Sequence, residues 1–494
     1  MHIKNILIAY YYCLIIILII SKRTNSMTNL YILTEERAKP NVLNQILEIY
    51  SKKFNKKLKR NELKIIPDIN QNEIFTNEYL IENAKLSGID NIVLKIASGN
   101  SSFVDFLVFE QSSAPKECSI NSESDGNNLK LLIEETKTSD KESRNTGVYQ
   151  RMSKFVYADY FYPNTPKIML YNIAEPDDDK IPSDTSVFGT NMLLTQNVEI
   201  IGKSLRHFDK FNSIDELINY KNGMRRPPKG NVPILITKTN DAIKISGRLS
   251  KPANAGNIGH DPNIGALTAI SKTLRCLGWD KDIIITDHGV KQEYVDRARS
   301  NKFFNIASIL DLKLEGVDIS DKKVSLKQYW HYEKNSEKNG TILLHLIGIT
   351  DAPRTEAIYE NHAGCERGYF YTSGYKALAL PKKDKNGVNL YLPDLILKND
   401  DNKEILLIEG KQSSTLDQGL EEIKHFESIE NEFIKKYYPS YSITRWVSTY
   451  GENIYENDIH PKVLFHLNKN GIFLLNKKTP TWLKDLIKQI INNY

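Results

Sequence analysis

The sequence predicts a multi-domain α/β protein. The chain has 494 residues, which exceeds the length that one ordinary hydrophobic core accommodates, so two or three domains are expected. Short apolar segments that read as strands alternate with segments whose apolar residues recur at helical spacing. A coarse order of aspartate, strand, loop, strand ending in Glu-x-Lys, helix and strand also occurs twice, which indicates two units of similar organisation.

The composition is that of an ordinary globular protein, with 40% hydrophobic and 26% charged residues. Net charge neither favours nor excludes a nucleic-acid partner, because outside the first 26 residues 63 Lys and Arg residues nearly balance 61 Asp and Glu residues. The four cysteines are far apart and form no CxxC pair. This spacing argues against a disulfide framework or a structural zinc site and favours a reducing compartment.

The first 26 residues allow two interpretations. Ile6 to Ile20 is a nearly pure apolar run behind Lys4, and it is short for a membrane span but suits a signal-peptide core. No small-x-small cleavage site follows, and Met27 opens a stretch that reads as a natural start with a first strand. We expect Met27 to be the true start of a cytoplasmic protein without membrane contact. The competing interpretation is an export signal or a membrane anchor.

Residues 27–220 are expected to form the first unit. Its apolar spacing predicts a helix over 41–53, strands over 92–96, 103–109 and 129–135, a helix over 149–160 and a strand over 167–171. The segment 112–128 is polar and contains Pro and Gly, which indicates a loop.

A basic stretch rich in Pro and Gly, residues 221–231, marks the clearest domain boundary. It opens a middle region, 221–330, that we expect to contact DNA. There Asp261 is expected to cap a helix that starts at Pro262 and stops at Gly278, ahead of a strand over 283–286. The last unit, 331–494, is expected to contain strands over 341–349, 391–397, 404–409 and 443–448 and a long amphipathic helix over 416–437.

The last unit carries the most informative motif. Pro393 and Asp394 lie in one apolar strand, and Glu409-Gly410-Lys411 ends the next. Side chains two apart on a strand share one face, so Glu409 and Lys411 project together. Mg²⁺ prefers carboxylate oxygens, and the backbone carbonyl of Gly410 offers a further ligand. A lysine can orient or help to deprotonate the attacking water and stabilise the charge that develops in phosphodiester hydrolysis.

A looser copy lies upstream, with Asp105, Glu135 and Lys137 and with Thr136 as the intervening residue. Isolated acidic-x-Lys triplets mean little in a lysine-rich chain, but these two follow apolar strands. Ionised groups at the ends of buried strands are costly without a partner or a metal. The competing interpretation, a pair of salt bridges at strand ends, stays open for this copy.

The arrangement resembles the PD-(D/E)XK nuclease superfamily, and the chain as a whole resembles a type II restriction endonuclease. The C-terminal residues match the motif fully, whereas Val104 stands where the upstream copy would carry the proline. The resemblance implies an α/β core with a mixed central sheet flanked by helices, in one or two modules. It also implies Mg²⁺-dependent hydrolysis of double-stranded DNA that leaves a 5′-phosphate. The implied metal-binding residues are Asp394, Glu409 and Gly410 in the last unit and Asp105, Glu135 and Thr136 in the first.

Two such sites admit two explanations, one site per DNA strand or one live site beside a degenerate copy. Motif completeness favours the C-terminal site as the competent one. Candidate DNA contacts follow the upstream copy, because Arg pairs with guanine edges and Asn or Gln with adenine. These candidates are Arg144, Asn145, Gln150 and Arg151. Helix capping and surface exposure explain the same residues equally well.

The expected partners are double-stranded DNA and, as a functional partner, a cognate DNA methyltransferase. Palindromic recognition sites favour two-fold symmetry, which is compatible with a homodimer. Three other functions stay open at this point. They are a structure-specific repair or recombination nuclease, a non-catalytic DNA-binding protein with a degenerate nuclease fold, and an exported or membrane-anchored protein.

Overall fold

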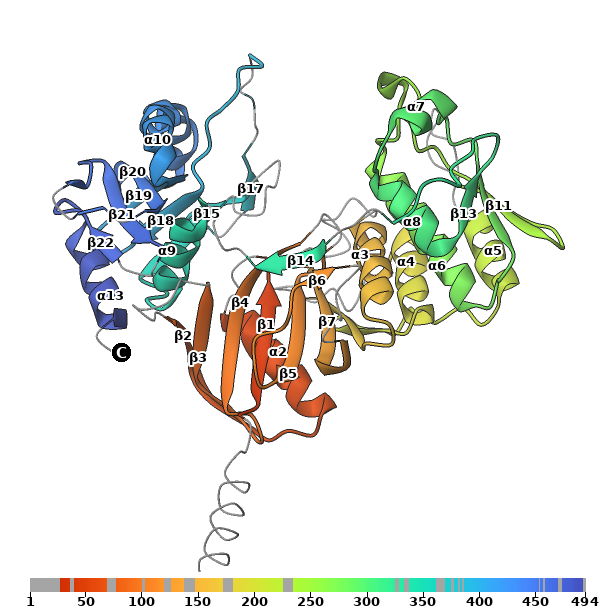
Figure 1. Ribbon diagram of the computed structural model, residues 1–494, viewed down its shortest axis with the longest axis horizontal. Coiled ribbons are helices and arrows are strands. Elements are labelled where there is room, and N and C mark those ends of the chain that lie inside the picture. The colour runs from red at the N-terminus through yellow and green to blue at the C-terminus, as the bar shows by residue number, and fades with distance from the viewer. Residues whose placement is uncertain are drawn as a thin grey trace, which may run out of the picture.

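The computed structural model shows three lobes, each built around its own sheet (Figure 1). It describes residues 27–35, 40–68, 77–99, 103–119, 126–136, 147–171, 181–224, 234–324, 328–332, 337–360, 369–374, 377–380, 383, 386–452, 454–455, 458–469 and 473–491. The apolar segment 1–26 lies outside these residues. Within them, every helix is too short or too polar to cross a lipid bilayer.

The first lobe holds a mixed sheet with the strand order β2-β3-β4-β1-β5-β7-β8-β9, which β6 and β14 extend beside β4. Its strands are β1 (Asn29–Thr34), β2 (Leu58–Pro67), β3 (Glu78–Leu86), β4 (Asn91–Gly99), β5 (Phe106–Gln111), β6 (Cys118–Ser119), β7 (Leu129–Thr136), β8 (Lys167–Tyr171), β9 (Val198–Ile201) and β14 (Gln328–Tyr332). The chain thus returns to this sheet after the middle lobe, and the predicted boundary at residue 330 falls inside β14.

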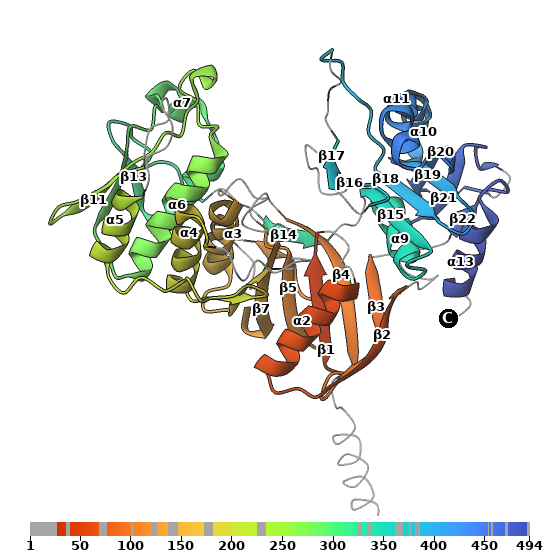
Figure 2. The same ribbon diagram turned by 180° about the vertical axis from the view of Figure 1, so that it is seen from behind.

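Helices cover both faces of the first sheet (Figures 1 and 2). Alternate residues of β1 enter different cores, because side chains alternate across a strand. Leu30 and Ile32 pack with α2 (Pro40–Lys53), whereas Tyr31 and Leu33 belong to the core that holds α3 (Gly147–Phe161) and α4 (Asp184–Thr195). The strand is therefore buried on both faces, which explains its continuous apolar sequence.

The middle lobe is a four-stranded sheet packed with helices. Its strands β10 (Ile236–Lys238), β11 (Ala242–Ser246), β12 (Asp282–Thr286) and β13 (Leu312–Leu314) lie in this order, with β11, β12 and β13 parallel. The associated helices are α5 (Ile214–Gly223), α6 (Asp261–Cys276), α7 (Gln292–Arg297) and α8 (Lys302–Leu310). Helix α6 begins one residue before the predicted start, and Gly278 follows its end at φ +90°.

Helix α6 also joins the middle lobe to the first lobe, since it packs against α3. The two helices approach closely at Gly265, where an added Cβ would lie 3.0 Å from the backbone nitrogen of Gln150. The Tyr157 hydroxyl of α3 donates a hydrogen bond of 2.9 Å to the carbonyl of Lys302 at the start of α8. These contacts fix α3 against two helices of the middle lobe.

The third lobe holds a mixed sheet with the order β15-β18-β19-β20-β21-β22. Its strands are β15 (Thr355–Glu360), β18 (Leu395–Asn399), β19 (Glu404–Gln412), β20 (Ser442–Gly451), β21 (Val463–Asn468) and β22 (Phe473–Leu475), and β16 (Tyr369–Tyr371) and β17 (Ala377–Ala379) form a separate hairpin. One face packs on α9 (Asn339–Ile349) and α13 (Thr481–Ile491). The other packs on the helical segment that contains α10 (Leu416–Glu422), α11 (Glu427–Ile429) and α12 (Lys435–Tyr437).

The first and third sheets repeat one topology. The strands β1-β5-β7-β8-β9 pair in the order antiparallel, antiparallel, parallel and parallel. The strands β15-β18-β19-β20-β21 pair in the same order. In each sheet the third strand leads into helices, α3 or α10 to α12, before the fourth. The repetition that the sequence predicts at the level of motifs therefore extends to strand pairing.

Four of the predicted elements differ from the structure in type or extent. The segment 341–349, predicted as a strand, lies in the buried helix α9, because a short apolar run does not distinguish a strand from a buried helix. The strands predicted from 103 and 391 begin at Phe106 and Leu395, so both aspartates lie just outside them. The helix predicted over 416–437 is divided by a 3₁₀ turn and a π turn.

Replacing Gly265 with Val should destabilise the protein, because the added side chain meets the backbone of Gln150 and Tyr149 within 3.1 Å. Overpacking of this kind costs about 1–3 kcal/mol, and chemical denaturation measures it. Gly223→Ala is the control, since no atom lies within 4 Å of the Cβ added there. Equal stability of both variants would show that α3 and α6 separate without cost.

Candidate functional site

The C-terminal motif residues meet at one end of the third sheet. Leu395 of β18 pairs with Ile408 of the antiparallel β19, so Asp394 lies opposite Glu409. The backbone N–H of Gly410 donates a hydrogen bond of 2.8 Å to Asp394 Oδ2. The predicted residues Asp394, Glu409, Gly410 and Lys411 are thus brought together.

Close packing makes glycine important at position 410. A Cβ there would lie 3.1 Å from Asp394 Oδ2 and 3.0 Å from the carbonyl oxygen of Glu337. Either atom would have to move to admit a side chain. Because Gly410 has no side chain, the Asp394 carboxylate can lie against the backbone of β19.

Lys411 lies between two carboxylates. Its Nζ is 2.7 Å from Glu409 Oε1 and 2.8 Å from Glu422 Oε2, the latter on α10. The side chains of Lys411 and Glu409 are each 8% exposed, so little water screens the pair. The sequence analysis did not assign Glu422 to the site. The sequence separation between Glu409 and Glu422 matches no known motif. Glu422 reaches Lys411 only because the helical segment folds over β19.

The electrostatics of this cluster favour an added positive charge. Burial raises the pKa of Asp394 to about 6, although the Gly410 amide and Lys411 act to lower it. Burial and then the nearby Asp394 raise the pKa of Glu409 to about 9, against the opposing effect of Lys411. Burial acts to lower the pKa of Lys411, but Glu409 and Glu422 outweigh it and raise that pKa above its ordinary value. The lysine is therefore protonated at neutral pH, and the carboxylates resist full ionisation without a further cation.

A second cluster occupies the equivalent place in the first sheet. Phe106 of β5 pairs with Ile133 of the antiparallel β7, so Asp105 lies opposite Glu134. The backbone N–H of Glu135 donates a hydrogen bond of 2.7 Å to Asp105 Oδ2. Lys154 of α3 approaches both acids, with Nζ 3.1 Å from Asp105 Oδ1 and 2.8 Å from Glu134 Oε1.

Glu134, and not the predicted Glu135, is the carboxylate that meets Asp105. The register places Glu134 where Glu409 stands, Glu135 where Gly410 stands and Thr136 where Lys411 stands. Because side chains alternate along β7, Glu135 leaves the strand on the face opposite Glu134. The buried Thr136 therefore occupies the strand position of the lysine, and the predicted Lys137 lies outside the described residues.

Burial and the nearby Asp105 raise the pKa of Glu134 to about 8, against the lowering effects of Lys154 and Arg151. Lys154 was missed because the lysine was sought on the strand. One signal was available, since Lys154 follows Arg151 by three residues and such residues share a helix face. Both side chains face Glu134, and the Arg151 Nε lies 3.8 Å from its Oε1.

The four predicted DNA-contact residues have different outcomes. Arg151 lies beside the first-lobe cluster. Gln150 has an exposed side chain in the first turn of α3, and its backbone contacts α6 at Gly265. Arg144 and Asn145 fall outside the described residues.

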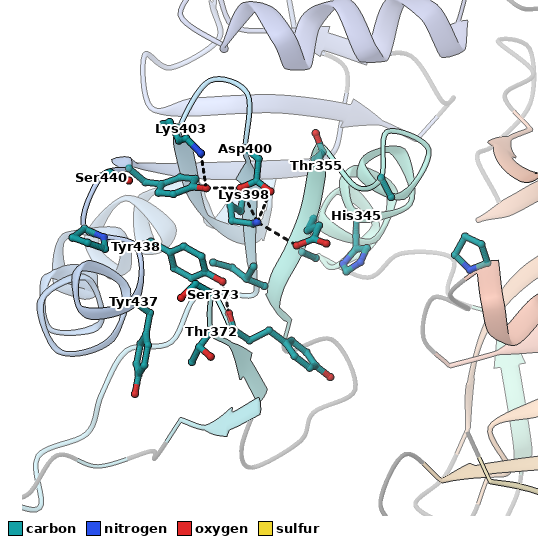
Figure 3. Close-up of a pocket in the computed structure, with 18 of the residues that line it drawn as sticks. His345, Thr355, Thr372, Ser373, Lys398, Asp400, Lys403, Tyr437, Tyr438 and Ser440 are labelled. Carbon is teal, nitrogen blue, oxygen red and sulfur yellow. Dashed lines mark hydrogen bonds and ion pairs between the residues drawn. The ribbon is translucent and has the colours of Figure 1, made fainter. Parts of the chain in front are cut away.

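A cavity of about 970 Å³ lies at the other end of β18 (Figure 3). Lys398 Nζ is 2.7 Å from Asp400 Oδ2 and 3.3 Å from Glu356 Oε2, and the Tyr441 hydroxyl donates a hydrogen bond to Asp400. Five strand residues separate Asp394 from Asp400, which corresponds to about 20 Å along the strand. The cavity is thus remote from the Asp394 cluster, and Lys398 within it is paired with two acids.

The Glu409→Gln variant tests the electrostatic state of the third-lobe cluster. The folded-state pKa of about 9 exceeds the ordinary 4.5, so the carboxyl contributes stability below its ordinary pKa that is lost as pH rises through the folded value. The neutral amide avoids this loss. In metal-free buffer the stability of Glu409→Gln relative to the unsubstituted protein should rise between about pH 5 and about pH 9, by on the order of 1–3 kcal/mol.

Thermal denaturation across that pH range measures the difference. The exposed Glu432 on the same helical segment provides the control as Glu432→Gln. A difference between variant and unsubstituted protein that does not change with pH would mean that Glu409 is not held at a raised pKa.

Comparison with models of known families, with curated proteins and with solved structures found no match to this chain.

Proposed function

We propose that this protein is a Mg²⁺-dependent DNA endonuclease, acting as a type II restriction enzyme, with a hydrolytic centre of Asp394, Glu409 and Lys411. The observation that carries the proposal is the convergence of the half-buried Asp394 and the buried Glu409 with a lysine at adjacent strand ends. The mixed sheet with helices on both faces supports it, because the PD-(D/E)XK resemblance implies that architecture.

The acidic groups fit a magnesium ion. In the described part of the chain, no three His, Cys, Asp or Glu side chains are grouped as a metal site. Mg²⁺ does not require such a cage, since it usually keeps several waters and is held by one or two carboxylates together with substrate phosphate. Asp394 and Glu409 would hold it here. Burial is the main cause of their raised pKa values, so a bound cation would favour their ionised forms.

Each residue has a role that follows from its chemistry. Bound Mg²⁺ supplies charge neutralisation and lowers the pKa of a coordinated water. Lys411 is protonated, so it serves as a hydrogen-bond donor that orients the water and stabilises developing negative charge. Glu422 holds the Lys411 ammonium from the α10 side. Gly410 keeps Asp394 in place by its N–H and by its lack of a side chain.

The middle lobe supports DNA as the substrate. Its loops after β11 and β12 meet, because the N–H groups of Leu249 and Ser250 both donate to the carbonyl of His288. Exposed cations stand on these loops, namely Arg248, Lys251 and Lys291. Such lysine and arginine side chains suit contacts to backbone phosphates, which position a protein on duplex DNA, although the exposed Asp287 lies on the same loops.

A DNA-binding protein without cleavage is the second candidate. The observation that favours it is that Lys411 already neutralises Glu409 and Glu422 within the protein. Ion pairs of this kind also occur in proteins as structural contacts without a bound metal. The two functions differ in one measurement, since only the nuclease converts bound DNA to fragments.

Incubation of plasmid and linear DNA with the full chain and Mg²⁺ should give discrete fragments. Lys411→Ala should reduce the cleavage rate about 100- to 1000-fold, as removal of one charge-stabilising donor does in other hydrolytic sites. Lys424→Ala is the matched control, because Lys424 is 63% exposed and pairs only with Glu421 among the ion pairs of the described residues. Gel shifts without fragments would favour the second candidate, and cutting restricted to branched DNA would favour a repair nuclease.

Gly410→Ala should lower activity by about 10- to 100-fold, the usual cost of disturbing a group that orients a metal-binding residue. The added methyl displaces Asp394 or the backbone at Glu337. Initial cleavage rates at several Mg²⁺ concentrations measure the effect, and raised Mg²⁺ should restore part of the rate. Unchanged kinetics would contradict a metal-binding role for Asp394.

A further inference from the structure

We propose that Asp105, Glu134 and Lys154 form a second hydrolytic centre, with its lysine supplied by helix α3, that cuts one DNA strand while the Asp394 centre cuts the other. This inference rests on the proposed function, because it assigns the second strand of the same substrate.

The first argument is positional equivalence. Both aspartates immediately precede the second of the five repeated strands, and both glutamates stand opposite them on the third. In each cluster the amide after the glutamate donates to Oδ2 of the aspartate, at 2.7 Å for Asp105 and 2.8 Å for Asp394. The two clusters therefore share a backbone hydrogen bond at the same register in addition to their paired acids.

The second argument concerns the ammonium group. Thr136 stands at the strand position of Lys411, so the strand itself offers no cation there. Lys154 fills this gap from the helix that covers the same face, and its Nζ contacts both Asp105 and Glu134. The three functional groups of the C-terminal centre are thereby reproduced, although the lysine comes from a different element.

The third argument is access. The Asp105 side chain is 34% exposed and that of Lys154 is 24% exposed, whereas Glu134 is 3% exposed. The cluster therefore reaches the surface at its aspartate while its glutamate is held inside. A phosphodiester could reach the Asp105 carboxylate through this opening.

The chemical step consumes one water, and a divalent cation would be its cofactor. The water oxygen forms a bond to phosphorus and its proton passes to solvent, while the bond between phosphorus and the 3′ oxygen breaks. The 3′ oxygen leaves as a hydroxyl after taking a proton, and the other product is a 5′-phosphate. Lys154 would donate a hydrogen bond to the phosphate as negative charge develops.

Strand-specific cleavage tests the assignment. Duplex DNA labelled on one strand or the other, and supercoiled plasmid, are incubated with the full chain and Mg²⁺. Lys154→Ala should leave nicked circles as the product, with one labelled strand cut at least about 100-fold more slowly. Lys411→Ala should spare that strand and protect the opposite one. Glu134→Gln provides an independent variant, and Lys313→Ala, an exposed middle-lobe lysine, provides the control.

Metal binding gives a readout that does not depend on cleavage. Titration of the protein with Mn²⁺ alone should reveal two sites in the unsubstituted chain and one in Glu134→Gln. Circular dichroism and denaturation confirm that each variant is folded, and an unfolded Lys154→Ala is replaced by Lys154→Met, which keeps the length of the side chain.

Three results would overturn the proposal. Linearisation by folded Lys154→Ala and Glu134→Gln at the unsubstituted rate would leave the C-terminal centre as the sole one, without affecting the proposed function. Equal loss of both strands would mean that the cluster supports folding or binding. A chain that cuts no DNA at all would remove the proposed function together with this inference.

Discussion

An antiparallel strand pair that sets two carboxylates opposite each other is the constraint on which both clusters depend. Because Leu395 pairs with Ile408, Asp394 lies opposite Glu409. Because Phe106 pairs with Ile133, Asp105 likewise lies opposite Glu134. Two carboxylates placed next to each other in a poorly solvated site repel strongly when both are ionised. The surrounding residues therefore have to supply positive charge and amide hydrogen bonds, and in both lobes they do.

The two clusters meet this demand with different residues. In the third lobe the strand carries Lys411 and the helix carries a carboxylate, Glu422. In the first lobe the strand carries Thr136 and helix α3 carries both cations, Lys154 and Arg151. Among the directly contacting groups, the third-lobe cluster thus holds three acids and one base, whereas the first-lobe cluster holds two of each. The third-lobe cluster has the greater need of a divalent cation.

The sequence predicts those site residues that lie close together along the chain, and it does not predict those that only the tertiary fold brings together. Asp394, Glu409 and Lys411 were found together because strand alternation alone aligns Glu409 with Lys411, and a single strand pair brings in Asp394. In the first lobe either Glu134 or Glu135 could lie opposite Asp105. The Glu135-Thr136-Lys137 spacing matched the motif, so the prediction chose Glu135, whereas the structure places Glu134 opposite Asp105. Only the pairing of β5 with β7 resolves this choice. Lys154, twenty residues beyond Glu134, belongs to a helix whose packing no spacing rule specifies. Helix α9 was predicted as a strand for a related reason. Its apolar run has no periodicity that would distinguish a helix from a strand.

The contact between α3 and α6 links the middle lobe to the first-lobe cluster mechanically. The backbones of the two helices meet at Gly265 without a side chain between them, and α3 also holds Lys154. A tilt of the middle lobe would therefore move α3, the helix that carries Lys154. If the middle lobe binds DNA as proposed, a displacement of α3 would also shift Lys154, the counter-ion of Asp105 and Glu134.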